Sequence, residues 1–234
     1  MVVAEESVFE VQRTLAELAA EAGPDATTAC AQWRVHDLVA HLVAGGIEVL
    51  RLVRAHLDGE PDSVTTPFAT REAPWRAAPF EGLIEVLGQS RDVTTALEIL
   101  ASEDPDARIL FTGWAMSANE LATHARSELA LHLWDVAGDD PTIRPHLASP
   151  DLTAHAVKAL RQFRGIAECG LPAQWVRRLG KAPLRLRSPG QDDVVINGAN
   201  GPLALAPPVA GADCELDAAD RLLILWGRRS LPER

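Results

Sequence analysis

The chain has 234 residues, of which 47% are hydrophobic and 24% are charged. These values are typical of globular proteins and argue against wholesale disorder, and the length allows one large domain or two small ones. The formal net charge of −11 makes nucleic acid and anionic membrane surfaces poor partners.

The start of the chain and its cysteines favour a cytoplasmic protein. Acidic residues occur within the first six positions, which predicts that no signal peptide is present. No apolar stretch approaches the ~20 residues of a membrane span. Cys30, Cys169 and Cys214 are odd in number and far apart, so they suit a reducing compartment and predict no disulfide framework.

The first part of the chain has the periodicity of long helices. Helical patterns cover 5–22, 35–58, 81–101 and 117–138, and a proline-rich loop is expected from 59 to 80. Ser117 and Glu120 form a capping box, in which the two side chains satisfy amides at the start of a helix. Four long helices predict an antiparallel four-helix bundle, whose sites are built from side chains of facing helices.

The character of the sequence changes near residue 149. A further helix is expected from there to about Cys169, and a last helix begins at Asp217. Between them lie three short β-like runs separated by Gly, Asn and Pro turns, at 182–188, 192–198 and 201–208. We therefore predict an α+β protein with a helical bundle over 1–148 and a small α+β domain over 149–234.

A candidate metal site stands out among the helices. Glu128 and His132 are four residues apart, so they project from one face of a helix. His41 lies in another predicted helix and supplies a third ligand. Two imidazoles and a carboxylate are the ligand set of a catalytic zinc site, which keeps one position open.

The helical geometry makes this convergence feasible without choosing the metal. Glu128, His132 and Asp135 fall within a sector of about 60° beside the apolar side of their helix. Imidazole and carboxylate suit Zn, and also Ni, Fe or Co. Two other interpretations stay open, because a Glu–His pair at this spacing is commonly a solvated helix contact and His41 is also consistent with a hydrogen-bonded core residue. His124, one turn before Glu128, competes with His132 for a ligand role.

Three motifs resemble the mycothiol-dependent maleylpyruvate isomerase family, part of a DinB-like superfamily of metal-binding four-helix bundles. The run ACAQWRVHDLVAHL is similar to the first family signature, which in this chain reads Cys30, Trp33, Val35, Asp37, Leu38, Val39, His41 and Leu42. The run ELALHLWD is similar to the second, a Glu-x-x-x-His with an Asp three residues later. The C-terminal ADRLLILWGRR resembles the end of the second domain of the family.

The resemblance implies a divalent metal, usually zinc, at His41, Glu128 and His132. It also implies mycothiol as a thiol cosubstrate, and an arginine of the second domain that contributes to activity. Arg228 is the best match to that arginine; it also reads as a cation at a helix C-terminus, where the helix dipole favours it. Asp135 is expected either to orient His132 or to be a surface carboxylate.

Three functions are consistent with this reading. The first is a metal-dependent, mycothiol-using isomerase or thiol transferase acting on a small electrophile such as an unsaturated carboxylate. A bound cation holds a thiol as the thiolate nucleophile. In the isomerase that the resemblance points to, the thiol adds to the double bond of maleylpyruvate, the resulting single bond rotates, and expulsion of the thiol gives fumarylpyruvate.

The second function is a metal-dependent enzyme in which metal-bound water replaces the thiol. The third is a non-catalytic ligand-binding module on the same scaffold, with the metal closed by a fourth protein ligand, His124. None of the cysteines sits at ligand spacing, so the nucleophile is expected from a cofactor or from water. The expected partners are a small-molecule substrate and a low-molecular-weight thiol, and the chain is expected to be a monomer or a homodimer.

Overall fold

The computed structural model describes residues 5–30, 32–60, 63–162, 183–197 and 203–232. The chain forms two compact units, divided between Asp140 and Pro141. The boundary expected between residues 148 and 149 falls inside the second unit. Within this unit, the segment before residue 149 is tied to the last helix, because Arg144 Nη2 lies 2.9 Å from Asp217 Oδ1 and 3.1 Å from Asp220 Oδ1.

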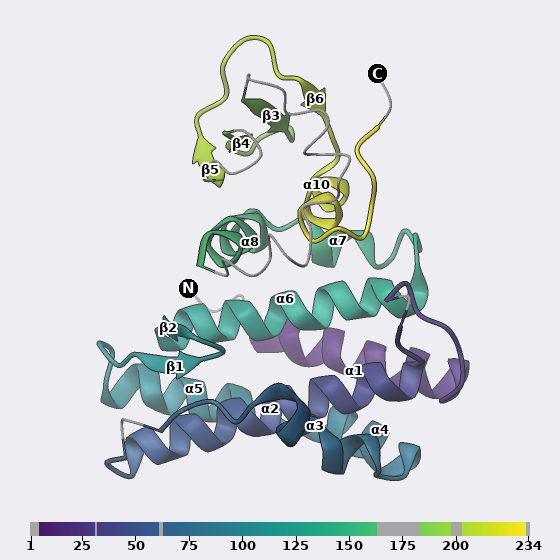
Figure 1. Ribbon diagram of the computed structural model, residues 1–234, viewed down its shortest axis with the longest axis vertical. Coiled ribbons are helices and arrows are strands. Elements are labelled where there is room, and N and C mark those ends of the chain that lie inside the picture. Colours follow the sequence, from purple (N-terminus) through teal and green to yellow (C-terminus); the bar gives the residue numbers. More distant parts are fainter. Residues whose placement is uncertain (1–4, 31, 61–62, 163–182, 198–202, 233–234) are drawn as a thin grey trace. The chain divides into compact units, whose positions relative to one another are not determined.

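The first unit is helical (Figure 1). Its described elements are α1 (Glu5–Ala22), α2 (Val35–Leu57), α3 (Phe68–Arg76), α4 (Phe80–Gln89), α5 (Asp92–Glu103), β1 (Ile109–Phe111), β2 (Trp114–Met116) and α6 (Ala118–Ala137). Helix α1 packs against α4 and α6, and α2 packs against α3, α4, α5 and α6. Their apolar faces form the core, with fully buried members that include Leu15, Leu38, Leu52, Leu83, Leu100, Leu121 and Leu133.

Two predicted elements of this unit differ from the structure. The single helix expected over 81–101 is two helices, because the chain becomes extended at Ser90. The side-chain amide of Gln12 donates to the carbonyls of Leu87 and Ser90, which satisfies acceptors at the end of α4. The loop expected over 59–80 contains α3, which begins after Pro67 and carries Pro74 near its end.

A two-stranded antiparallel hairpin of β1 and β2 precedes α6, and the sequence reading did not predict it. Helix α6 then begins where the capping box placed it. Glu120 N donates to Ser117 Oγ at 3.2 Å, and Ser117 N donates to Glu120 Oε2 at 3.0 Å. The helix ends at Gly138, whose φ of 68° is a conformation that residues with a Cβ rarely adopt. These two ends fix the helix that carries Glu128 and His132.

The second unit combines helices with a small sheet. Its described elements are α7 (Arg144–Leu147), α8 (Pro150–Gln162), β3 (Leu184–Arg187), β4 (Asp193–Ile196), β5 (Leu203–Ala206), β6 (Cys214–Glu215) and α10 (Ala218–Leu225). The sheet order is β5-β4-β3-β6, with β3 and β6 parallel and the other pairs antiparallel. The three predicted strands and the last helix are present, β6 was not predicted, and the expected helix beyond residue 162 lies outside the described residues.

The fold class is therefore α+β with an N-terminal helical domain, as predicted. Within the described ranges, no helix is both long enough and apolar enough to cross a membrane.

Candidate metal centre

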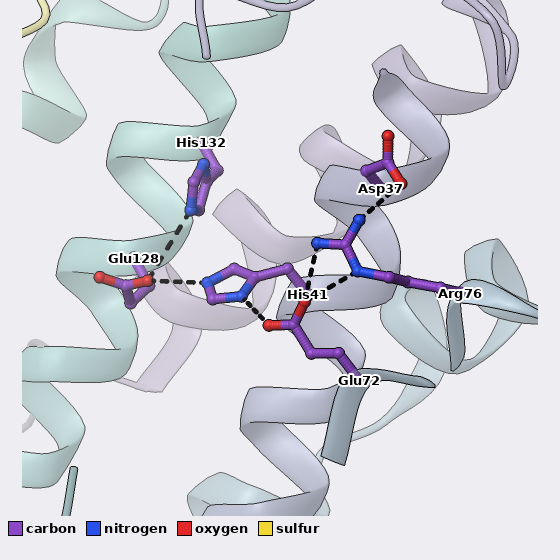
Figure 2. A network of polar contacts seen from close by, with 6 residues as sticks. All are labelled: Asp37, His41, Glu72, Arg76, Glu128 and His132. Carbon is purple, nitrogen blue, oxygen red and sulfur yellow. Dashed lines mark hydrogen bonds and ion pairs between the residues drawn. The ribbon is translucent and has the colours of Figure 1, made fainter. Parts of the chain in front are cut away.

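The structure brings together His41 of α2 with Glu128 and His132 of α6 (Figure 2). One ligand atom from each of the three lies within 4.8 Å of the other two. Both imidazoles turn Nε2 toward the same carboxylate oxygen. The distance to Glu128 Oε2 is 3.3 Å from His41 and 3.7 Å from His132.

Each imidazole has its other nitrogen held by a second carboxylate. His41 Nδ1 lies 2.6 Å from Glu72 Oε1, and His132 Nδ1 lies 2.8 Å from Asp135 Oδ2. Glu72 and Asp135 are 1% and 3% exposed, so these contacts are shielded from water. A carboxylate on the outer nitrogen fixes the tautomer and the ring orientation of metal-binding histidines. The contact expected between Asp135 and His132 is present.

Glu72 is itself anchored by an arginine (Figure 2). Arg76 Nε and Nη2 donate to Glu72 Oε2 at 3.0 and 2.8 Å. Arg76 Nη1 donates to Asp37 Oδ1 at 2.6 Å, and the other oxygen of Asp37 accepts the backbone N–H of Arg34. The network therefore ties α3 to the start of α2, one turn before His41.

The electrostatics of the cluster favour charged imidazoles and a charged Glu128. Burial by itself lowers the pKa of His41, but hydrogen bonds with Glu128 and Glu72 outweigh it and raise that pKa. For His132, burial is again outweighed, and contacts with Asp135, Cys30 and Glu128 raise the pKa well above its ordinary value. Burial raises the pKa of Glu128, yet hydrogen bonds with His132 and His41 bring it well below its ordinary value. A cation at this point would replace the protons on the two Nε2 atoms.

Aromatic rings line the histidine pair. The ring centroid of Trp33 lies 4.8 Å from that of His41 and 5.8 Å from that of His132, and Phe68 lies 5.6 Å from His41. The two imidazole centroids are 5.3 Å apart. Trp33 therefore packs against both candidate histidine ligands. Apolar rings lower the local dielectric and so strengthen the electrostatic contacts beside them.

His124 belongs to neither group of ligand atoms that the described residues form. Its ring lies 5.4 Å from Phe111, and burial lowers its pKa although the charge of Glu128 opposes this. Its competition with His132 for a ligand position stays a prediction.

The position of Cys30 corrects the expectation that no cysteine is placed to be a metal ligand. Its Sγ lies 3.2 Å from Asp135 Oδ2, and Cys30, His132 and Asp135 form a second group of ligand atoms within 4.8 Å of one another. Spacing along the chain could not reveal this, because Cys30 and Asp135 are 105 residues apart. The turn before α2 folds onto the end of α6, where Ala29 N donates to Asp135 O at 2.9 Å.

Arg228 lies in the second unit, where its Nη1 donates to Trp226 O at 3.3 Å. Its contribution to activity stays a prediction. Glu72 and Arg76 were missed because they lie in the segment read as a loop. Their i, i+4 spacing was the available signal, since a glutamate and an arginine so placed pair on a helix.

A family model described as the mycothiol maleylpyruvate isomerase N-terminal domain matches residues 5–137. No curated protein matches the sequence. The fold is similar to a crystal structure of a mycothiol-dependent maleylpyruvate isomerase, with a TM-score of 0.56, 14% identity and coverage of 96% of this chain and 89% of that one. A histidine-to-alanine mutant of such an isomerase gives a TM-score of 0.57 at 12% identity, with the same coverage.

Proposed function

The chain belongs to the mycothiol maleylpyruvate isomerase N-terminal domain family, and from this premise we propose that it is a metal-dependent isomerase or thiol transferase. In this proposal mycothiol is the thiol cosubstrate and the substrate is a small electrophile, such as an unsaturated carboxylate. The cytoplasm, where thiols stay reduced, is the matching compartment. Arg228 is proposed to position a carboxylate of the substrate, because a guanidinium pairs with carboxylates through parallel hydrogen bonds.

The observation that carries the proposal is the way the two histidines are held. Each has its outer nitrogen fixed by a buried carboxylate and its inner nitrogen turned toward Glu128. That arrangement of two imidazoles and one carboxylate fits a zinc-type cation and leaves a position for an exogenous ligand.

The residues divide the work between them. His41 and His132 would hold the cation through Nε2, and Glu128 would hold it through Oε2. A bound divalent cation supplies a positive charge that keeps a coordinated thiol in its nucleophilic thiolate form. Glu72 and Asp135 keep the imidazoles oriented, and Trp33 limits the access of water to the histidine pair.

The test begins with the metal content of protein purified without added metal and without a chelating tag. We expect about one equivalent of cation per chain, lost in His132→Ala and retained in His56→Ala. His56 is a matched control because it also lies on α2 but pairs with Asp104 instead of Glu128. Turnover of an electrophilic unsaturated carboxylate is then measured with and without mycothiol.

Each result decides one part of the proposal. Metal content that depends on His132, together with thiol-dependent turnover, supports both the metal site and the use of mycothiol. Absence of metal in the native protein, with no uptake of Zn²⁺, Co²⁺ or Ni²⁺ on titration, overturns the metal site. Metal-dependent turnover that proceeds equally without thiol overturns the role of mycothiol and leaves the metal site standing.

A further inference from the structure

A second set of metal-ligating atoms lies on the other side of His132. Cys30 Sγ and His132 Nδ1 both contact Asp135 Oδ2, at 3.2 and 2.8 Å. These atoms face away from Glu128, since Nε2 is the nitrogen of His132 that points toward Glu128. Thus one imidazole faces two separate groups of ligand atoms, one through each nitrogen.

We propose that Cys30, Asp135 and the Nδ1 atom of His132 form a second cation site, which takes a thiophilic divalent ion such as Zn²⁺ or Cd²⁺. A thiolate, an imidazole and a carboxylate are all ligands that zinc uses, and the sulfur gives the set its preference for soft ions. The first group contains no sulfur. The two sites therefore differ in the chemistry of the ions they prefer.

The two contacts at Asp135 need only a small adjustment to hold an ion, and the three ligand atoms lie within 4.8 Å of one another. Tetrahedral zinc keeps its ligand atoms about 3.3–3.8 Å apart. The contacts at Asp135 Oδ2 must lengthen by about half an ångström or less to reach that range. Asp135 and His132 are 3% and 4% exposed, whereas Cys30 is half-buried and gives an ion access from solvent.

The backbone already holds Cys30 in place. Its carbonyl accepts hydrogen bonds from Trp33 N at 2.8 Å and from Thr28 Oγ1 at 3.1 Å. The neighbouring Ala29 N donates to the carbonyl of Asp135. Such a pre-formed turn lowers the ordering cost of binding, because little main chain must be fixed when the ion arrives.

Sharing His132 makes the two sites interdependent. A neutral imidazole offers one lone pair, so ions on both sides require a second deprotonation of the ring. Two dications would then be balanced by Glu128, Asp135, the Cys30 thiolate and the imidazolate, a charge of −4 against +4. The ring cannot reach this state by itself at neutral pH, so we expect the two ions to bind with different affinities.

The experiment is a titration of metal-depleted protein with Co²⁺ and with Cd²⁺, under a phosphine reductant. The parent protein is Cys169→Ser/Cys214→Ser, in which Cys30 is the only thiol of the chain. We expect a thiolate-to-metal charge-transfer band in the near ultraviolet, lost in the further variant Cys30→Ser. His41→Ala should keep the band while losing the ion bound with Glu128, and His132→Ala should lose both.

A second readout guards against misfolding of a variant. In the parent protein, Cd²⁺ should slow alkylation of Cys30 by iodoacetamide about tenfold or more, because this soft ion binds sulfur tightly and occupies the lone pair that would attack the reagent. Absence of both the band and the protection, at saturating Co²⁺ or Cd²⁺, overturns the second site. If one equivalent still binds in that case, the site proposed at His41, Glu128 and His132 is unaffected.

Discussion

Two clusters, one in each unit, are built around a carboxylate and differ in the basic residues that contact it. In the second unit, Asp193 has no exposed side-chain surface and is contacted by Arg187 and Arg185 at 2.8 and 3.0 Å. In the first unit, Glu128 is 28% exposed and its contacts with two imidazoles are longer, at 3.3 and 3.7 Å. Both carboxyl groups have a lowered pKa, through arginines in one case and histidines in the other.

The difference between arginine and histidine partners determines whether the basic residues of each cluster can become metal ligands. Guanidinium groups stay protonated at all physiological pH values, so Arg185 and Arg187 cannot become ligands of a cation. Both oxygens of Asp193 accept hydrogen bonds from these arginines, which makes the cluster a structural tie between β3 and β4. Imidazoles can give up their protons and become ligands. In the proposed metal site the two imidazoles would exchange their protons for a cation, and the buried carboxylates Glu72 and Asp135 contact the outer nitrogens of both rings.

The largest effect we expect on stability comes from the structural cluster. Asp193→Asn removes the charge that Arg185 and Arg187 contact and should lower the free energy of unfolding by about 3 kcal/mol. Urea denaturation followed by circular dichroism measures this change. Metal affinity, measured in parallel, should be unaltered, and a loss of bound metal in this variant would contradict the separation of roles.

The same cluster predicts an acid-labile contribution to stability. The arginines, Arg187 first, hold the pKa of Asp193 at about 2, below its ordinary 3.8. The folded protein therefore binds this proton less readily than the unfolded chain does, and its stability increases with pH across that interval. The contribution is fully present above the ordinary value and is lost as the pH falls through about 2. The difference in unfolding free energy between wild type and Asp193→Asn should accordingly shrink as the solution is acidified below pH 4.

Glu72→Gln tests whether the outer carboxylate holds His41 in the orientation that the proposed metal site needs. The amide keeps the size of the side chain but gives a weaker hydrogen bond to His41 Nδ1 and no ion pair with Arg76, so the imidazole is less firmly oriented. We expect metal affinity to fall by about 10–100-fold, the usual effect of removing a carboxylate behind a histidine ligand. Isothermal titration calorimetry with Zn²⁺ on metal-depleted protein gives the dissociation constant of each variant.

Glu17→Gln is the matched control for that substitution. Glu17 is also a helical glutamate paired with an arginine at four residues' distance, but its side chain is 62% exposed and lies on α1. Its replacement should leave zinc affinity unchanged. Equal affinities for the Glu72 and Glu17 variants would show that orientation of His41 does not depend on α3.

The sequence was informative where the signal is local. Helix α6 begins at a capping box and carries Glu128 and His132 at a spacing that fixes their common face, so the helix and two of the candidate ligands followed from adjacent residues. The break between α4 and α5 was not readable in this way. It is supported by Gln12, whose amide reaches the end of α4 from a different helix.

The parts of the site that were missed depend on tertiary contacts. Glu72 lies among prolines that favour a loop, and its position on α3 is supported by Arg76 and, through it, by Asp37. Cys30 reaches Asp135 because a turn preceding α2 folds onto the end of α6. The spacing of Glu72 and Arg76 was a local signal, but the contacts of Arg76 with Asp37 and of Cys30 with Asp135 were not readable, since periodicity records which face of an element is apolar and not which elements meet.

The smallest effect is expected at the cap that positions the site helix. Ser117→Ala removes the acceptor for Glu120 N and should lower the free energy of unfolding by about 1 kcal/mol. Glu128 and His132 lie about three and about four turns further along α6, beyond the first turn to which the effect of a cap is confined. Zinc affinity should therefore match that of the wild type, while urea denaturation should show the lower free energy of unfolding. A fall in affinity as large as that of Glu72→Gln would mean that the ligands depend on the start of the helix, and that the rigidity of the site does not come from its outer carboxylates.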